Sequence, residues 1–454
     1  MDGHRVLNVL GSVSPSVKNE HPDFGLYNEI QKTGGAGSDK SALLSSSSAQ
    51  QSKHTPPSSL SPSTHHLSGS YKGDYLNTRN AAWALDKWKF LPMLRTALSH
   101  SPSSKWFFFV ETDTYFSISN LVSYLQHFDP SQPHYIGKHL YIQSIEFAYG
   151  GAGFVLSRPA LKQMVERYEK EKEEYEDFVG SHWVGDCAVG KLAADVGVKL
   201  WKAWPHLQGD GVRTMDPNGT KIGRGSWCFP GVSWHHVDEE EIEELWSYEQ
   251  EWGRRHDGNV LMRHRDLYVD LVRPRIGARI LDWDNLAESR SYNASGAKHA
   301  SRREKLDALE REAWRSEEDC RELCEGERRC LQFVFEEGEG EEEKICKLGF
   351  EFRLGYRRNG VGGWNEKGKG KGKGKGRVIS GWMMERVEDL FLELEGGCGV
   401  RDWWAPPPSP SPKHQEEGKK KMKEKEKESE KKEDAKEEEE EKEQASKLRR
   451  SKES

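Results

Sequence analysis

Residues 106–115 read Trp-Phe-Phe-Phe-Val-Glu-Thr-Asp-Thr-Tyr, and this stretch decides the fold more than any other part of the sequence. An apolar run bounded by polar residues predicts a buried strand. In an open α/β sheet ligands bind just beyond the carboxyl ends of strands, where Glu111 and Asp113 lie, and both side chains point in roughly the same direction if the strand continues. Carboxylates suit hard cations, so the pattern indicates metal-assisted handling of a phosphate, although acidic residues after strands are more often turn formers or helix caps.

The composition limits the core and the partners. Of the 454 residues, 31% are charged and 34% hydrophobic, so long stretches must be solvated or disordered. The net charge of -7 is small for this length and argues for no nucleic-acid partner. No apolar stretch approaches the roughly 18 residues that span a bilayer, and the N-terminus lacks a basic segment followed by an apolar one. We therefore expect no membrane anchor or secretion signal in the chain as written.

Four of the seven cysteines form a cluster in the sequence: Cys320, Cys324, Cys330 and Cys346. Their spacing lacks the paired short gaps of zinc ribbons, and no histidine accompanies them, so we favour two disulfides over a zinc site. Disulfides require an oxidising compartment. The glycosylation sequons at Asn218 and Asn293 fit a secretory route.

Strands and helices alternate around the acidic motif. Apolar residues recur at mixed helical spacing from Ala81 to Leu98, where Pro92 interrupts the pattern. The expected elements that follow are a helix over 121–128, a strand over 134–138, a glycine turn and strand over 149–157, a helix from Ser157, and a helix over 185–197 that Gly197 ends. This alternation predicts an α/β fold with a mainly parallel sheet.

Composition shifts suggest five segments. They are residues 1–33, an N-terminal part of the main domain that looks truncated; 34–70, a low-complexity insertion; 71–290, the main α/β domain; 300–395, a cysteine-containing module with low-complexity inserts; and 405–454, a disordered Lys/Glu tail.

Several segments, taken in order, resemble one family. Residues 106–115, Tyr149 to Phe154, Gly185 to Gly190 and Ser233 to Val237 look like the motif series of the Fringe and core 1 β-1,3-galactosyltransferase group, which is glycosyltransferase family 31. The fungal branch looks most similar, because residues 85–92 also resemble a segment that its members carry. The cysteine cluster is similar to a PAN or apple-like module, whose expected pairing joins the outer cysteines and the inner ones. Sequence alone leaves three connectivities open.

The resemblance implies a GT-A fold with a Rossmann-type mixed sheet, followed by a small disulfide-bonded α+β module. It also implies a divalent metal, usually Mn²⁺, and a UDP-sugar donor. The reaction would move a hexose or N-acetylhexosamine, with inversion, to a glycan or glycoprotein hydroxyl, as a β-1,3 linkage. The location would be the Golgi or the secretory pathway lumen, with membrane attachment only through an anchor upstream of this chain.

The metal ligands follow from the same resemblance. Asp113 matches the last acidic position of the family's Asp-X-Asp motif and is the expected direct ligand. Glu111 replaces the first Asp and would contact the metal, the donor ribose or a metal-bound water. His235 matches the histidine of the third metal-binding element. His236 points the other way if its strand is regular, and either histidine could instead be a hydrogen-bonded core residue.

Asp186 is the expected catalytic base, because it matches the acidic residue that the family places before a helix. Displacement with inversion needs a base that takes the acceptor proton. The alternative is that Asp186 only caps the helix, and both roles are compatible.

Gly150, Gly151 and Lys87 are expected at the donor. The glycines would allow the backbone to approach the sugar, or would simply form a tight turn. Lys87 would neutralise donor phosphate, or would lie at the surface.

A second function remains open at the level of sequence. GT-A domains begin with a strand that grips the nucleoside, and no such strand is visible before Val6. A degenerate, noncatalytic carbohydrate- or protein-binding protein is therefore the alternative to a transferase.

Overall fold

The computed structural model describes residues 7–32, 81–182, 184–219, 225–256, 260–299, 306–338, 340, 343–358 and 376–398. The predicted insertion at 34–70 and the Lys/Glu tail at 405–454 lie outside these ranges, as does the Lys-Gly run near 370.

A four-stranded sheet with the order β1-β6-β3-β7 forms the first part of the fold. Its strands are β1 (Trp106–Phe109), β6 (Phe154–Ser157), β3 (Tyr135–Gly137) and β7 (Leu200–Lys202). Strand β6 runs antiparallel to both β1 and β3, whereas β3 and β7 are parallel. The α/β class and the mixed sheet are confirmed.

The prediction of a mainly parallel sheet is wrong. Between β3 and β6 the chain forms a hairpin of β4 (His139–Ile142) and β5 (Ile145–Ala148), followed by the glycine turn. This connection contains no crossover helix, and parallel neighbours need such a crossover. Strand β6 therefore returns beside β3 in the opposite direction.

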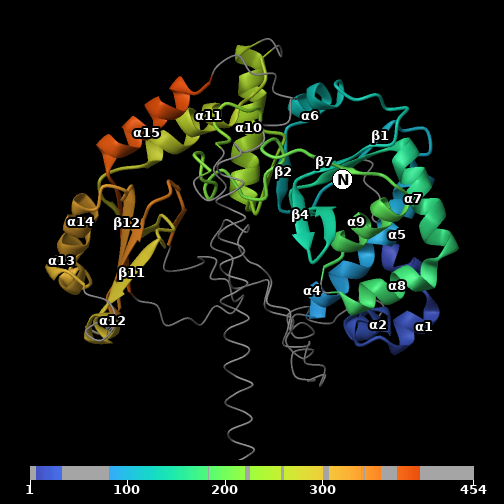
Figure 1. The fold of residues 1–454 in the computed structure, drawn as a ribbon, viewed down its shortest axis with the longest axis horizontal. Coiled ribbons are helices and arrows are strands. Elements are labelled where there is room, and N and C mark those ends of the chain that lie inside the picture. Colours follow the sequence, from blue (N-terminus) through green and yellow to red (C-terminus); the bar gives the residue numbers. More distant parts are fainter. Residues whose placement is uncertain are drawn as a thin grey trace, which may run out of the picture. The chain divides into compact units, whose positions relative to one another are not determined.

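Each face of this sheet packs on its own core. Phe107 and Phe109 of β1 contact a core shared with α5 (Phe90–His100), α7 (Arg158–Lys170) and α9 (Asp186–Asp195). Figure 1 shows these three helices gathered on one side of β1 and β7. Trp106 and Phe108 point to the other core, which includes α6 (Ile118–Leu125). The apolar run is thus covered on both faces, as a strand of large apolar residues requires.

Local sequence signals set the helix boundaries. Ser157 accepts a hydrogen bond from the Ala160 amide and caps α7. Gly197, with φ of 75°, follows the end of α9. Pro92 lies in the first turn of α5, where a missing N–H costs little, so it does not interrupt that helix. Ahead of α5 the chain forms α4 (Ala81–Asp86) and a 3₁₀ turn, Lys87–Lys89.

Residues 7–32 are helical and pack on Trp88. They form a 3₁₀ turn at Val9–Ser12, α1 (Pro15–Glu20), a second turn at Pro22–Phe24 and α2 (Gly25–Lys32). Phe24 and His21 meet the Trp88 ring edge-on, with ring centroids 5.4 and 4.9 Å away. This segment completes the first core.

A second small ladder joins the acidic motif to a distant strand. Strand β2 (Thr114–Phe116) pairs antiparallel with β8 (Ser233–His235), so that Thr114 lies opposite His235. The helix α10 (Glu239–Arg255) follows β8, and α8 (Lys172–Ser181) precedes α9. After α10 come α11 (His264–Leu267), a π-helical turn at Tyr268–Val272 and a 3₁₀ turn at Arg273–Arg275.

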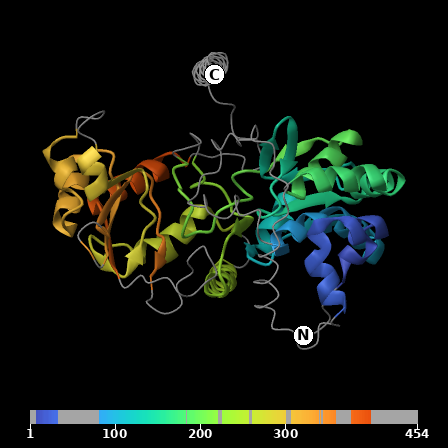
Figure 2. The same cartoon turned by 90° about the horizontal axis from the view of Figure 1, so that it is seen from below.

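The C-terminal part is built on a five-stranded antiparallel sheet with the order β11-β13-β12-β15-β9. Its strands are Arg290–Asn293, Ile345–Gly349, Gln332–Glu337, Arg377–Trp382 and Ile280–Leu281 in that order, and β10 (Trp283–Asp284) pairs with β14 (Tyr356–Arg357). The helices are α12 (Ala294–His299), α13 (Ala308–Glu312), α14 (Glu317–Gly326) and α15 (Met384–Gly396). Figure 2 shows the orange helices along one side of this sheet.

Three disulfides form among the described residues. Cys320 bonds to Cys346 and Cys324 to Cys330, which is the outer-with-outer and inner-with-inner order that the resemblance implied. The sequence analysis missed the third, Cys228 to Cys398, whose cysteines are 170 residues apart. It ties the loop before β8 to the end of α15, while Cys187 is buried and forms no disulfide.

No helix in the described part of the chain is both long enough and apolar enough to cross a bilayer.

Candidate metal and donor site

The predicted motifs meet at one glycine turn. Gly150 lies between β5 and β6, and its amide donates to the Asp186 carboxylate at 2.9 Å. The carbonyl of Gly151 accepts a hydrogen bond from the Thr114 hydroxyl at 2.7 Å. A Cβ on Gly151 would lie on the edge of the His235 ring, nearest to Nε2. The turn therefore contacts the motif strand, the helix α9 and the strand β8 at once.

Thr114 fixes the His235 ring and its tautomer. Its Oγ1 lies 3.0 Å from Nδ1 of His235 in a buried hydrogen bond. Because the single hydroxyl proton is donated to Gly151, we infer that Nδ1 carries a proton and donates it to Thr114. Nε2 then keeps its lone pair and is the nitrogen of this ring that could ligate; it packs against Gly151, where a Cβ would collide with it.

Asp113, His235 and His236 form a cluster with one ligand atom each, all within 4.8 Å of one another. The Asp113 carboxylate lies 3.5 Å from Nδ1 of His235, and its side chain is 48% exposed, so an ion can reach it from solvent. The expectation that His236 points away is wrong. Strand β8 ends at His235, and His236 takes a left-handed conformation with φ of 58°, which brings the two ring centroids to 3.8 Å.

This donor set fits a divalent cation of the Mn²⁺ type, which takes carboxylate oxygen together with imidazole nitrogen. Burial, helped by the neighbouring His236 and Lys138, lowers the pKa of His235 to about 2. Burial also lowers the pKa of His236, against the raising effect of Asp113. Both rings are therefore neutral at ordinary pH, as metal ligation requires.

Glu111 lies in a turn, and the strand that alternation assumed to continue has already ended. Strand β1 ends at Phe109, and the Thr114 amide donates to the Glu111 carbonyl at 3.3 Å, closing a turn. Burial and then the negative charge of Asp86 raise the pKa of the Glu111 carboxyl to about 7. The negative charges of Asp113 and Asp186 add to this shift, so both of these site carboxylates act on Glu111.

Asp186 is buried at the start of α9, with 7% of its surface exposed. Its carboxylate accepts hydrogen bonds from the amides of Gly150 and Cys187, each at 2.9 Å. Burial raises the pKa of the Asp186 carboxyl to about 7, although these two amides oppose the shift. Gly185, not Asp186, occupies the N-cap position, so a simple capping role does not describe this residue.

The glycine turn is tight and closely packed. The Gly153 amide donates to the Gly150 carbonyl at 2.9 Å, and Gly153 has φ of 79°. A Cβ at Gly150 would lie 2.9 Å from the Phe90 ring. The tight turn alone therefore explains why these positions need glycine.

Lys87 binds residues away from the glycine turn. Its amine lies 3.0 Å from the Asp23 carboxylate and donates to the His182 carbonyl at 2.9 Å. Asp23 also accepts from the Trp88 indole at 2.8 Å. Lys87 thus joins the N-terminal helices to the end of α8, and the structure does not bring it to the glycine turn.

Sequence reasoning missed Thr114 and Lys138, and it preferred His235 over His236 as the metal ligand. Thr114 was inside the opening motif, but nothing in its spacing showed a bond to a histidine 121 residues away. The signal for His236 was its adjacency to His235.

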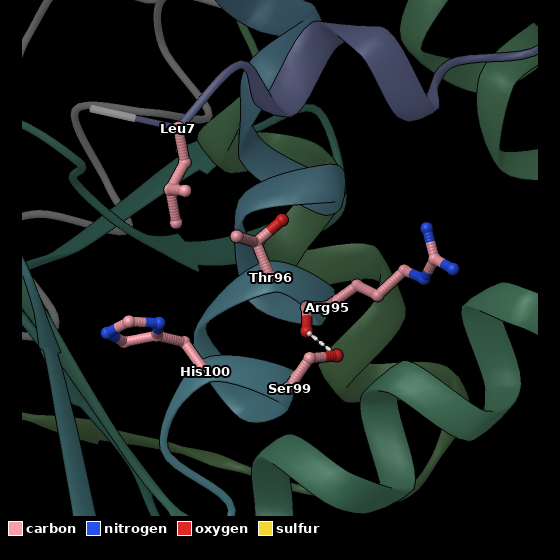
Figure 3. A pocket seen from close by; sticks show the side chains of 5 residues that line it. All are labelled: Leu7, Arg95, Thr96, Ser99 and His100. Carbon is pink, nitrogen blue, oxygen red and sulfur yellow. Dashed lines mark hydrogen bonds between the residues drawn. The ribbon is translucent and has the colours of Figure 1, made fainter. Parts of the chain in front are cut away.

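A shallow surface hollow lies at a separate place, on α5. Figure 3 shows its lining residues, Leu7, Arg95, Thr96, Ser99 and His100. Arg95 is paired with Glu169 at 3.1 Å. The hollow contains none of the predicted site residues and no arrangement suited to the expected chemistry.

The family comparison matches the part of the chain that builds this site. Residues 89–204 match the model of the Fringe-like family, a range that contains Asp113, the glycine turn and Asp186. The resemblance to the Fringe group that the motifs indicated is thus supported over residues 89–204.

Part of the chain is also similar to a known protein. Over 96 residues, 20% of this chain, the sequence is 34% identical to glycoprotein-N-acetylgalactosamine 3-beta-galactosyltransferase 1 of Xenopus laevis. The aligned segment spans 26% of that relative's length. The similarity is therefore to a part of that protein, and the histidines of β8 lie beyond the range of the Fringe-like match.

Proposed function

We propose that this protein is an inverting, Mn²⁺-dependent glycosyltransferase. It would move a hexose or N-acetylhexosamine from a UDP-sugar to a hydroxyl of a glycan or glycoprotein, with a β-1,3 linkage. The observation that supports this most is that Asp113, His235 and Asp186 come together around the Gly150–Gly151 turn. Asp113, the turn and Asp186 lie within the range that matches the Fringe-like family, and His235 lies beyond it.

Asp113, His235 and His236 would hold the metal. A divalent cation supplies stabilisation for the negative charge that develops on the departing diphosphate. The residues supply the position: the Thr114 hydroxyl lies 3.0 Å from Nδ1 of His235, and the missing side chain of Gly151 lets the His235 ring pack against the glycine turn. The exposed Asp113 carboxylate completes the set from the solvent side.

Asp186 would act as the general base. A base that titrates near neutral pH combines a deprotonated fraction with enough proton affinity to assist the attack of a hydroxyl. Burial raises the pKa of Asp186 to about 7, which meets this condition. The amides of Gly150 and Cys187 orient its carboxylate, so that the proton of the acceptor hydroxyl passes to an oxygen whose direction is fixed.

Glu111 would contact the donor ribose rather than the metal. Strand β1 ends at Phe109, before Glu111, and Asp86 and Lys89 act on the pKa of its carboxyl together with Asp113 and Asp186.

The location and the C-terminal module complete the proposal. Three disulfides and the family are consistent with the secretory pathway, and we place the protein in the Golgi lumen. The antiparallel sheet with the Cys320–Cys346 and Cys324–Cys330 bonds would be an apple-like module that holds a glycan or protein partner.

The test is UDP release from a panel of UDP-sugars, with and without glycan acceptors. We expect release that requires Mn²⁺, stops with a chelator and is lost in Asp113→Ala. Glycan binding that is indifferent to chelator, with no turnover of any UDP-sugar, would contradict the proposal and favour a noncatalytic binding protein.

A further inference from the structure

Lys138 lies beside the metal cluster and has no role in the function described so far. It follows β3 and begins the β4–β5 hairpin, whose base is closed by a hydrogen bond from the Tyr149 amide to the Lys138 carbonyl at 2.7 Å. The Lys138 amine lies 5.8 Å from the centroid of the Tyr149 ring. That ring meets the His235 ring edge-on, with centroids 5.4 Å apart. One tyrosine therefore separates the lysine from the proposed metal ligand.

A glycine allows this arrangement. A Cβ on Gly209 would lie 2.5 Å from Nζ of Lys138 and 2.9 Å from the Tyr149 ring, so the bare backbone of Gly209 is packed against both side chains. The next residue, Asp210, is 8% exposed, and its negative charge acts on Lys138. Burial lowers the pKa of Lys138, and the negative charge of Asp210 opposes this shift. The loop after β7 thus holds the amine in place and supplies a carboxylate that favours its charged form.

The charge of Lys138 reaches the metal ligands, whereas nearby cations are paired with carboxylates. Both His235 and His236 experience the positive charge of Lys138. Lys87 is paired with Asp23 at 3.0 Å, and Lys89 with Asp86. Arg213, in the loop after Asp210, is paired with Glu244 at 3.2 Å.

A charge count shows why a further cation is needed. A divalent ion held by one carboxylate and two neutral imidazoles leaves a net charge of about +1. A departing nucleoside diphosphate brings roughly three negative charges, so the metal alone does not balance it. A lysine close to the ligands is the kind of group that binds phosphate oxygens as a point charge.

We propose that Lys138 binds the diphosphate of the nucleotide, with Tyr149 and Gly209 as the residues that position its amine beside the metal cluster. This inference rests on the proposed function, since it assigns a residue to the same donor site. It predicts that the charge of Lys138 weakens the binding of the metal ion and strengthens the binding of the diphosphate. The amine repels a cation at the cluster and attracts the anion that follows it.

Calorimetry on Lys138→Met tests this, with Mn²⁺ alone and then UDP in saturating Mn²⁺ as the two probes. We expect Mn²⁺ to bind the variant as tightly as the wild type or more tightly, and UDP to bind about tenfold or more weakly. Lys202→Met is the matched control, because Lys202 also lies over a tyrosine ring, 5.5 Å from Tyr141, and is paired with Glu146 at 2.8 Å. We expect neither affinity to change in this control.

The outcomes separate this inference from the proposed function. If Lys138→Met weakens Mn²⁺ and UDP together, the lysine supports the fold of the loop and the inference is wrong. Unchanged UDP affinity in the variant overturns it as well, while Mn²⁺-dependent UDP binding by the wild type leaves the proposed function standing. If the wild type itself binds no UDP, the proposed function fails first.

Discussion

The glycine turn at 150–151 and the disulfide-bonded sheet each contain a glycine that accommodates a ring, but the two rings differ in chemistry. In both regions a glycine lies where a Cβ would collide with a ring from another strand. At Gly151 that ring is His235, and at Gly381 of β15 it is Phe333 of β12. The first ring is titratable and close to a carboxylate, whereas the second is fully buried in an apolar core. The chemistry of the side chain that fills the space, and not the glycine, distinguishes a site from a core.

The largest effect is expected at the disulfide that joins the loop before β8 to the end of α15. Replacing Cys228 and Cys398 by alanine opens a loop of 170 residues and should lower the free energy of unfolding by about 5 kcal/mol on a chain-entropy estimate. The control is the pair Cys324 and Cys330, with a separation of 6, for which the same estimate gives about 2 kcal/mol. Denaturant unfolding measures both. A smaller loss for the long loop than for the short one would contradict this ranking.

Removing the exposed carboxylate should abolish turnover without affecting the fold. Asp113→Ala should reduce Mn²⁺-dependent UDP release by about a thousandfold or more, since it removes the one anionic ligand of the cluster. Stability should change little, because the side chain is half exposed. Asp129→Ala is the control: this exposed carboxylate caps a turn through the Ser131 amide at 2.9 Å, away from the cluster. Equal activity of the two variants would remove Asp113 from the metal site.

The same substitution at Gly151 and at Gly381 compares the two regions directly. Gly151→Ala should weaken Mn²⁺ binding by roughly ten- to a hundredfold, because the new Cβ displaces the His235 ring. Gly381→Ala should leave Mn²⁺ affinity unchanged and lower the free energy of unfolding by about 1–3 kcal/mol through overpacking against the Ala278 carbonyl and the Phe333 ring. Gly253→Ala, in α10 with open space around it, controls for the substitution itself. Metal titration and thermal unfolding read the two effects separately. If both variants lose only stability, the comparison fails.

The pH dependence of turnover and of stability tests the region of the glycine turn, because Asp186 contacts that turn. Burial raises the pKa of Asp186 to about 7, and only its deprotonated form accepts a proton, so the rate should fall about tenfold per pH unit below that value. The native state holds this proton between about pH 4 and 7, where the unfolded chain has released it. The contribution of Asp186 to stability is therefore present at low pH and is lost as the pH rises through about 7.

Asp186→Asn is the control for the pH dependence of the rate and for the pH dependence of stability. The variant should lack the turnover and should lose less stability than the wild type as the pH rises from 4 to 7. A rate that is flat from pH 5 to 8 in the wild type would argue against Asp186 as the base.

The sequence contained most of the site but not its geometry. The strand at 106–109 and the helix at 186–195 followed from apolar periodicity and glycine or serine signals. The mixed sheet, Asp113, Asp186 and His235 followed from the resemblance and its motif order, whereas periodicity alone gave a mainly parallel sheet. The left-handed backbone of His236 is invisible in a strand pattern, since non-glycine residues rarely adopt it. The partners of Lys87, Cys228 and Thr114 lie 64 to 170 positions away, and no local rule reaches that far.

Calorimetric titration of UDP into the wild-type protein, with Mn²⁺ and again with a chelator, tests the central claim most directly. If Asp113, His235 and His236 hold a metal that receives the donor diphosphate, UDP binds saturably with Mn²⁺ and the heat disappears when the metal is removed. UDP binding that is equal in both conditions, or no binding in either, would contradict the account.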